Sequence, residues 1–391
     1  MAEAAVVLGV TERHSYRIKA RIREEGVQGV IHGNRGRLCS WKLSEKTEKR
    51  IKELARGKYR GFNDHHLTEK LEEEEGIKLS REKVRRVLRC GGISSPRRRR
   101  SPRHRSRRER REAEGMMVQI DGSPHDWLEG RGPYLCLVGA IDDATSMVPA
   151  AFFEEQETSW AYLRLFLEMG KKQGLPLSAY ADRHSIFWTD REPTVGEQLA
   201  GKRPKTQVGR ALEELAITLI PAGSPQAKGR IERLWGTFQD RLVSELRLCG
   251  AKTKQQAQAV LDHFLPQYNR RFSKPALEAQ PAWRKVELKR LEQSLCFKYQ
   301  RTVAKDNTVQ FEGGLFQIPK RSSYHSYANK KVQVHVLLDG AVEFFCHREK
   351  IARFDSKTRH TIGLYRTNGR REISSYGPQT TDPGVLYELS P

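Results

Sequence analysis

The sequence is poor in cysteine and has no long apolar run. Its six cysteines stand far apart and none forms a CxxC pair, which argues against a disulfide framework or a zinc knuckle. No run of about eighteen uncharged apolar residues is present, so a membrane-spanning helix is excluded. The first residues also lack the basic-then-apolar order of a signal peptide. These absences predict free thiols in a reducing cytoplasm.

What the sequence does have is an excess of cations concentrated at one end. The formal net charge of the 391 residues is +23, and residues 1–115 hold 32 Lys and Arg against 17 Asp and Glu. A basic arm of this kind is typical of a protein that binds a polyanion. Nucleic acid fits better than an anionic membrane, because the arginine run has no apolar helix face. The length predicts about two to four domains.

Residues 1–36 predict a helix-turn-helix unit. A short apolar helix should break at Gly9, and Thr11 can cap a second helix that runs to about Glu25. Side chains of that helix expected to face inward are Tyr16, Ala20 and Ile22. The cations assigned to DNA binding are Arg13, Arg17 and Arg21.

Residues 40–93 repeat this pattern as a second helix-turn-helix unit. Ser44 can cap a helix that ends near Arg56, a second helix follows at about 65–75, and Ser80 can cap a third. The third helix has an apolar face made of Val84, Val87 and Leu88. The cations assigned to DNA on its other side are Arg81, Arg85 and Arg86. A cationic second helix is how such units enter the major groove, although ordinary amphipathic hairpins would show the same pattern.

Residues 94–114 are predicted to be an arginine-rich linker. Ten arginines stand between Arg97 and Arg111, so the segment cannot bury a core and should be disordered without a partner. On DNA it can follow the phosphates without reading the sequence, whereas a plain spacer would not need ten guanidinium groups. The arginines assigned to DNA here are Arg97, Arg98, Arg99 and Arg100.

Between residues 115 and 290 predicted strands alternate with predicted helices. The strands are expected at 116–121, 134–143, 146–155, 177–182 and 217–222. The helices are expected at 159–173, 208–216 and 229–248, and residues 254–290 look helical with an interruption near 273–275. Three antiparallel-looking strands followed by strand–helix alternation predict an α/β domain, a mixed sheet with helices on its faces.

The last part of the chain differs from the α/β region. Residues 295–353 show short strands with turns at Gly313-Gly314 and at Asp339-Gly340, which predicts a small all-β barrel. The tail, residues 354–391, gives no structural signal. The chain as a whole is therefore predicted to be multidomain, with an all-α N-terminal region, an α/β core and a β C-terminal domain.

Three acidic residues of the core are candidate metal ligands. Asp121 is expected to end the first strand, Asp182 ends the fourth, and Glu232 lies near the start of the long helix at the border of its buried face. Carboxylates that converge at one end of a sheet suit Mg²⁺ or Mn²⁺. Two such metals can support phosphodiester transfer. The structural alternative is that strand-end Asp residues form turns and that a helix-start Glu complements the helix dipole.

Four motifs in this region carry a family resemblance. They are DGSPHDW at 121–127, AIDDATS at 140–146, YADRHSIF at 180–187 and SPQAKGRIER at 224–233, and YNRRFSKPA at 268–276 follows them. They resemble the core motifs of integrase-type D,D,E transposases, and most of all the ISNCY group of bacterial insertion sequences. The resemblance implies a ribonuclease-H-like core that binds Mg²⁺ or Mn²⁺, with a triad at Asp121, Asp182 and Glu232. Against this family, the first helix-turn-helix unit is expected to be N-terminally incomplete.

The sequence departs from the compact retroviral integrases in one region. Asp182 and Glu232 are separated by 49 residues, a longer stretch than those enzymes have, and the polar segment 189–206 is expected to be an inserted loop. The fourth strand continues Asp-Arg-His-Ser rather than Asp-Asn-Gly. These differences concern the loop after Asp182 and not the ligand itself.

Other polar residues near the motifs have competing interpretations. Asp142 and Asp143 are rivals for the second carboxylate, but their place between two strands favours a turn. Turn formation is also the better interpretation for His125 and Asp126.

Further residues could contact DNA. Lys228 and Arg230 flank Glu232 and are assigned to phosphates, with solvated cations as the alternative. His184 could meet a phosphate or the leaving oxygen. Trp127 and Trp188 could stack on a base, but packing is the better expectation.

The resemblance implies metal-dependent cleavage at transposon ends followed by strand transfer into target DNA. Its partners would be the two DNAs and further copies of the chain, because two ends are processed together, and its location would be the bacterial cytoplasm, on the nucleoid when bound to DNA. Two other classes stay open. One is a catalytically silent DNA-binding protein derived from a transposase, and the other is a ribonuclease-H-like nuclease.

Overall fold

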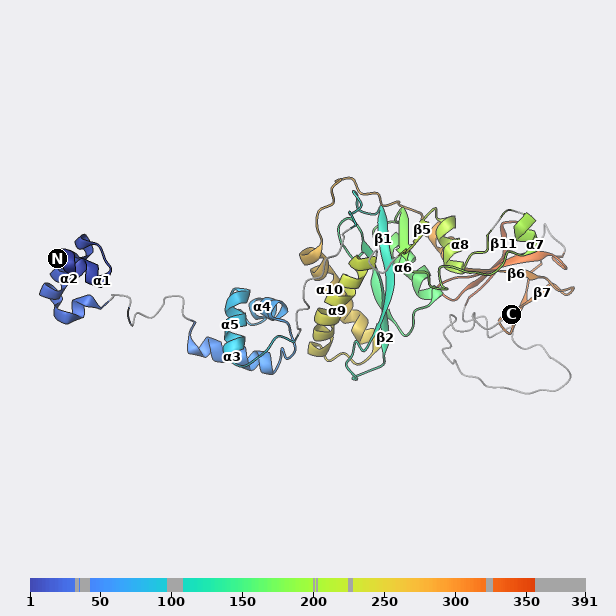
Figure 1. The fold of residues 1–391 in the computed structure, drawn as a ribbon. Helices are drawn as coiled ribbons and strands as arrows, with labels where there is room; N and C mark the ends of the chain where they lie inside the picture. Colours follow the sequence, from blue (N-terminus) through green and yellow to red (C-terminus); the bar gives the residue numbers. More distant parts are fainter. Residues whose placement is uncertain are drawn as a thin grey trace. The chain divides into compact units, whose positions relative to one another are not determined.

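The computed structural model of the chain (Figure 1) describes residues 1–31, 35, 43–96, 108–199, 201, 203–223, 228–320 and 326–355. The chain divides into two compact units. The first comprises Met1–Arg60 with Leu67–Ser95, and the second comprises Gly61–His66 with Pro96–Pro391. Among the described residues, no helix combines the length and the apolar character that crossing a membrane would need.

The first unit begins with three short helical elements: α1 (Ala2–Leu8), α2 (Glu12–Glu25) and η1 (Gly26–Val30). Gly9 ends α1 in the left-handed conformation, and the Thr11 side chain caps α2 by accepting from the backbone of His14, as predicted. The predicted inward face of α2 is wrong, since its three residues are exposed: Tyr16, Ala20 and Ile22. The reason is that η1 folds back onto α2 through small residues. A Cβ at Gly29 would lie 2.6 Å from the carbonyl oxygen of Arg21.

A second group of helices follows: α3 (Glu45–Arg56), α4 (Asp64–Glu73) and α5 (Arg81–Cys90). Ser44 and Ser80 cap α3 and α5 with their side chains, as predicted. The predicted apolar face of α5 is buried, with exposures of 0–7% at Val84, Val87 and Leu88. This face packs against α3, where Ile51 is fully buried. Burying each such side chain contributes about 1.5–3 kcal/mol.

The second unit is built on a five-stranded sheet with the order β3-β2-β1-β4-β5. Its strands are β1 (Met117–His125), β2 (Leu135–Asp142), β3 (Ala151–Glu154), β4 (Ser178–Ala181) and β5 (Thr218–Pro221). The strands β1, β2 and β3 pair antiparallel, whereas β4 is parallel to β1 and β5 is parallel to β4. The predicted mixed sheet is therefore confirmed.

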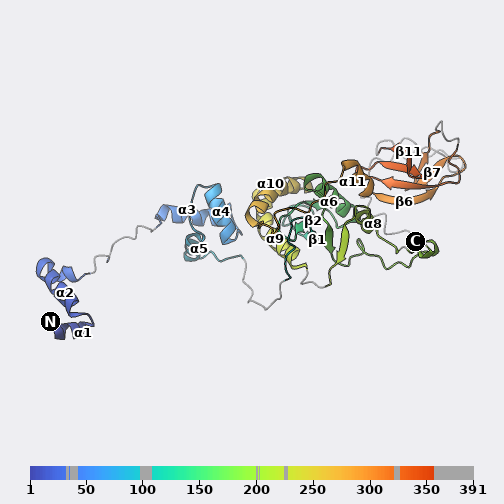
Figure 2. The same cartoon turned by 90° about the horizontal axis from the view of Figure 1, so that it is seen from above.

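Helices cover both faces of this sheet (Figures 1 and 2). Successive side chains of a strand point to opposite faces, and β2 is buried along its whole length. Its residues Cys136 and Val138 belong to the core under α6 (Ser159–Lys172) and α8 (Gln207–Glu214), whereas Leu135 and Leu137 belong to the core under α9 (Gly229–Leu248) and α10 (Lys254–Phe272).

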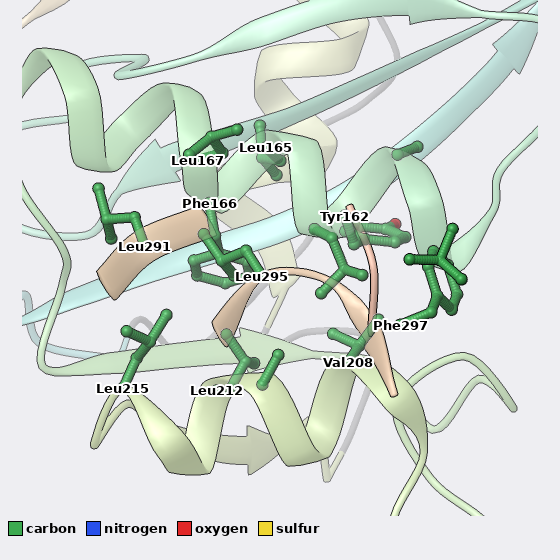
Figure 3. Close-up of a cluster of buried hydrophobic side chains, with 14 of the residues drawn as sticks. Tyr162, Leu165, Phe166, Leu167, Val208, Leu212, Leu215, Leu291, Leu295 and Phe297 are labelled. Carbon is green, nitrogen blue, oxygen red and sulfur yellow. The ribbon is translucent and has the colours of Figure 1, made fainter. Parts of the chain in front are cut away.

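The connections around these helices fit the sequence expectations in part. Helix α10 ends at Phe272 and the chain re-enters a helix only at α11 (Leu288–Ser294), so most of the predicted helix after residue 275 is not formed. The predicted insertion at 189–206 contains a short helix, α7 (Val195–Leu199). In Figure 3 the apolar residues of α6, α8 and α11 meet in one cluster, with Phe166 and Leu212 facing Leu295.

The C-terminal strands form an antiparallel sheet of order β11-β10-β9-β6 and a separate hairpin, β7-β8. Their bounds are β6 (Phe297–Thr302), β7 (Thr308–Phe311), β8 (Gly314–Gln317), β9 (Lys331–Val336), β10 (Val342–Cys346) and β11 (Glu349–Phe354). The predicted closed barrel is wrong: within the described strands, β6 and β11 remain the two edges of an open sheet. The hairpin covers one sheet face instead, and the ring of Phe316 lies 5.4 Å from that of Phe344.

Candidate active site

The strand register brings Asp121 and Asp182 together. Strands β1 and β4 are parallel and pair Gln119 with Tyr180, so the two aspartates occupy equivalent positions two residues farther along. Residues two positions apart share a sheet face, which places both carboxylates on one side. The prediction that Asp121 ends its strand is wrong, because β2 continues to pair with β1 as far as His125. Asp182 directly follows β4, as predicted.

A lysine ammonium lies between these two aspartates. Lys228 Nζ is 2.7 Å from Oδ1 of Asp121 and 3.3 Å from Oδ2 of Asp182. The lysine side chain is only 9% exposed. Burial by itself would lower the pKa of Lys228, but the charges and hydrogen bonds of the two aspartates outweigh it, and the pKa is raised. The ammonium therefore stays charged, and a single cation position reaches both carboxylates.

The first turns of α9 lie along β1. The indole nitrogen of Trp235 donates to Oδ2 of Asp121 at 3.0 Å, and the backbone nitrogen of Ile231 donates to Oε1 of Gln119 at 3.3 Å. Glu232 is exposed in the first turn of this helix. Lys228 is the N-cap residue that precedes this helix, and unlike Glu232 it is buried. The structure thus brings Asp121 and Asp182 to one point but does not bring Glu232 to it: among the described residues, no hydrogen bond joins Glu232 to either aspartate, and the three do not form a ready metal-binding group.

One further carboxylate, Glu157, interacts electrostatically with the two aspartates and was not predicted from the sequence. Glu157, just before α6, accepts a hydrogen bond from the buried hydroxyl of Tyr162. Its Oε2 would lie 2.7 Å from a Cβ at Gly122. Because successive residues of a strand point to opposite faces, Glu157 lies over the α6 face of β1, whereas the Asp121 side chain lies on the α9 face, where it contacts Trp235. Burial raises the pKa of Glu157, and the charges of Asp121 and Asp182 raise it further. An acidic residue just before a predicted helix was the only available signal, and its proximity to β1 depends on the tertiary fold.

The loop after Asp182 is held by its own side chains. Trp188 donates its indole N–H to the carbonyl oxygen of Asp182 at 2.9 Å, and it packs on the core, so its packing role is confirmed. His184 is exposed, and its Nδ1 accepts from the backbone of Ile186 at 3.3 Å. The backbone that presents Asp182 is thereby fixed from within the loop.

The rival pair, Asp142 and Asp143, is structural. Both residues are fully buried. Asp142 accepts from the backbone of Gly115 and from both the backbone and the hydroxyl of Thr145, which forms the predicted turn. Burial nevertheless raises the pKa of Asp142.

Asp143 is surrounded by cations of two segments. Its carboxylate binds Arg108, Arg230 at 2.8 Å, the side-chain amide of Gln119 at 3.1 Å and the backbone of Arg111 at 3.0 Å. Residues 108–111 thus contact the core, unlike the free linker that the sequence predicts.

The DGSPHDW motif beyond Asp121 is also structural. The backbone of Gly130 donates to Oδ1 of Asp126 at 3.0 Å, so the expected turn role of Asp126 is confirmed. Trp127 is fully buried, donates to the carbonyl oxygen of Ser123 and contacts the ring of His125 edge-on. Because its ring is buried, Trp127 cannot stack on a nucleic-acid base in this conformation.

The cations assigned to DNA fall into four groups. The arginines of α2 are exposed and follow one another at intervals of four residues, which places them on one face: Arg13, Arg17 and Arg21. The arginines of α5 are exposed too, and two of them pair with Glu82: Arg81, Arg85 and Arg86. Those of the linker, Arg97, Arg98, Arg99 and Arg100, lie outside the described residues. Lys228 and Arg230 bind carboxylates of the core instead of facing solvent.

Whether a divalent cation fits depends on the carboxylates. Among the described residues, no three acidic, histidine or cysteine side chains lie close enough together to hold a metal as they stand. Asp121 and Asp182 nevertheless offer oxygens to one shared position, which Lys228 now fills. An all-oxygen donor set of this kind suits Mg²⁺ or Mn²⁺.

No protein-family model matches the chain. Two solved structures overlap with parts of it at low similarity. The magnesium-bound trimeric form of the HTLV-2 integrase catalytic core shares 16% identity over 39% of this chain and 84% of its own, with a TM-score of 0.30. The intasome of simian T-cell lymphotropic virus shares 14% sequence identity with this chain. The match covers 77% of this chain and 97% of that one, with a TM-score of 0.35. Scores this low do not establish a relationship.

The sequence relatives are far more similar. The transposase for insertion sequence IS1202 of Streptococcus pneumoniae is 29% identical over 98% of this chain and 89% of its own length. The putative transposase y4bF of Sinorhizobium fredii is 34% identical over 345 residues, which cover 88% of this chain and 74% of that protein. At this identity and coverage, the chain belongs to the family of insertion-sequence transposases.

Proposed function

We propose that the chain is a D,D,E transposase of the ISNCY group, which cleaves DNA at the ends of an insertion sequence and joins those ends to target DNA. The observation that carries this proposal is the convergence of Asp121 and Asp182 on one cation position, under a helix that carries Glu232. Membership in the transposase family supports the reaction type. The five-stranded mixed sheet with helices on both faces supports a ribonuclease-H-like core.

Each residue of the site has a separate task in this proposal. Asp121, Asp182 and Glu232 would hold Mg²⁺ or Mn²⁺, which supplies Lewis-acid activation of the attacking oxygen and charge neutralisation at the phosphate. Trp235 orients Asp121 through the hydrogen bond to Oδ2, and Trp188 fixes the backbone of Asp182. Orientation by such outer partners matters because small displacements of the ligands weaken both metal binding and catalysis.

DNA would be held mainly by the basic N-terminal part. We assign residues 1–36 and 40–93 to two helix-turn-helix units, residues 94–114 to a basic tether, residues 115–290 to the catalytic core and residues 295–353 to an accessory β domain. Support comes from the exposed arginines of α2 and α5, which leave one face of each helix available for phosphates. Because an element has two ends, we expect the active form on DNA to be a homo-multimer.

The experiment uses a duplex that carries the terminal repeat flanking the coding region. Asp121→Asn, Asp182→Asn and Glu232→Gln should each abolish Mn²⁺-dependent cleavage and leave duplex binding unchanged in a gel-shift assay. Glu155→Gln is the matched control, since Glu155 is an exposed acidic residue that follows β3. Cleavage at the wild-type rate by any of the three variants would remove that residue from the proposed triad.

A second candidate is a DNA-binding protein without catalysis. It is favoured by the absence of a ready-made three-ligand set among the described residues and by the lysine that fills the shared position. The same duplex distinguishes the two candidates. Specific binding without cleavage in Mg²⁺ or in Mn²⁺, by a chain whose fold is intact, would support the silent protein.

A further inference from the structure

The position of Lys228 has consequences beyond its neighbours. The residue directly precedes α9, and its side chain is buried against β1 and β4 with its nitrogen within hydrogen-bond distance of two carboxylates. Arg230, two residues later, binds Asp143 instead. Lys228 and Arg230 therefore bind different carboxylates. Of the two, only Lys228 contacts the aspartates of the proposed triad.

The ammonium and a divalent cation would compete for the same oxygen atoms. Trp235 already occupies Oδ2 of Asp121, so Oδ1 is the oxygen that remains for a cation, and Lys228 holds it at 2.7 Å. Two carboxylates face each other here, and without a counter-charge they would repel one another. A compact ammonium on a flexible four-carbon stem can neutralise part of this charge and can also leave without moving the helix.

We infer that Lys228 is the resident counter-ion of the metal-free site, which holds Asp121 and Asp182 together and must leave its position when a divalent cation binds. The inference rests on the proposed function, because it takes these aspartates as metal ligands. It assigns Lys228 a positioning role in which it restrains the site against early metal loading. Once displaced, the ammonium lies at the start of α9 and is available to a DNA phosphate. The phosphate contact expected of Lys228 from the sequence would then form after metal binding.

The test measures metal binding in the whole chain by calorimetric titration with Mn²⁺ alone. Lys228→Met should bind Mn²⁺ roughly tenfold more tightly than the wild type, because no charge-assisted hydrogen bonds have to be broken first. Arg233→Met is the matched control, since it removes an exposed cation near the start of α9, and its affinity for Mn²⁺ should stay within about twofold of that of the wild type. A merely structural role for Lys228 would leave the affinity unchanged or weaken it, and either result would overturn the inference.

Two additions keep the test decisive. Lys228→Gln retains a hydrogen-bond donor without the charge and should also bind Mn²⁺ more tightly, which covers the case in which the methionine variant does not fold. In the wild type, the side-chain ¹⁵N signal of Lys228 should shift as Mg²⁺ saturates the site, and an unchanged signal at saturation would overturn the inference. If neither the wild type nor the variants bind Mn²⁺, the metal site itself fails, and the proposed function fails with it. Equal affinities would refute only the role of Lys228.

Discussion

Asp143 offers a sharp test of the division between structural and catalytic carboxylates. Its side chain is fully buried and binds the guanidinium groups of Arg108 and Arg230, of which Arg230 is only 10% exposed. Asp143→Ala would leave the Arg230 charge buried without this partner and would take an acceptor from the buried amide of Gln119. Removing one member of a buried ion pair costs about 3–5 kcal/mol.

That cost predicts a large fall in the melting temperature of the second unit. For a domain of this size, each kcal/mol shifts the melting temperature by about 2–4 °C, so we expect a fall of roughly 6–20 °C in differential scanning calorimetry. Asp126→Ala is the control, since Asp126 makes one exposed turn hydrogen bond, whose loss costs about 1 kcal/mol.

The same variant separates the two interpretations of the acidic pair. Below its melting temperature, Asp143→Ala should still be stabilised by Mn²⁺ as much as the wild type is, because Asp143 does not contact the Asp121–Lys228–Asp182 site. An unchanged melting temperature would refute the buried-pair reasoning. Loss of the Mn²⁺ effect in a folded variant would instead return Asp143 to the list of metal ligands.

Three further predictions follow from individual contacts. Trp235→Phe keeps the ring but removes the hydrogen bond to Asp121, so Mn²⁺ affinity should fall roughly tenfold in a calorimetric titration, and an unchanged affinity would show that Trp235 only packs. Burial lowers the pKa of His335 from 6.5 to about 3. Between these two pH values the unfolded chain binds a proton at His335 that the folded chain does not bind. The free energy of unfolding therefore decreases as the pH falls from 6.5 towards 3. His335→Leu should therefore show a flatter dependence of melting temperature on pH over this window, and a parallel dependence would contradict the shift. In a third variant the linker arginines are replaced by Gln, except Arg108 and Arg110, which contact the core. The slope of log DNA affinity against log salt concentration should fall by about 0.9 for each replaced arginine that contacts a phosphate. A slope equal to that of the wild type would show that the linker is only a tether.

Several elements could be predicted from local sequence because local physics decides them. Side-chain caps such as Ser44 and Ser80 satisfy backbone donors within one turn of the same residue, so their helices could be located without a tertiary contact. The apolar period of α5 and the continuous apolar run of β2 are equally local, and both are buried in the structure. The family motifs indicate Asp121 and Asp182 as candidate metal ligands.

Other features depended on how distant segments pack. The sequence predicted a buried Tyr16 and a closed C-terminal barrel, but Tyr16 is exposed and the sheet is open. An apolar period indicates which face of an element can be buried, but not which segment packs against it. The approach of Glu157 to β1 is likewise invisible along the chain, since it lies 36 residues from Asp121 in the numbering and reaches it only through the packing of α6.

By itself, the sequence determined the order of helices and strands in the core, the basic character of the N-terminal arm and the identity of the candidate carboxylates, because these follow from composition, periodicity and motif. Only the tertiary structure decided which charges meet. The parallel pairing of β1 with β4 aligned Asp121 with Asp182, and the path of α9 brought Lys228 between them and Arg230 onto Asp143. The physical reason is that an ion pair depends on a separation of a few ångströms, which strand register and helix packing set and which spacing along the chain does not.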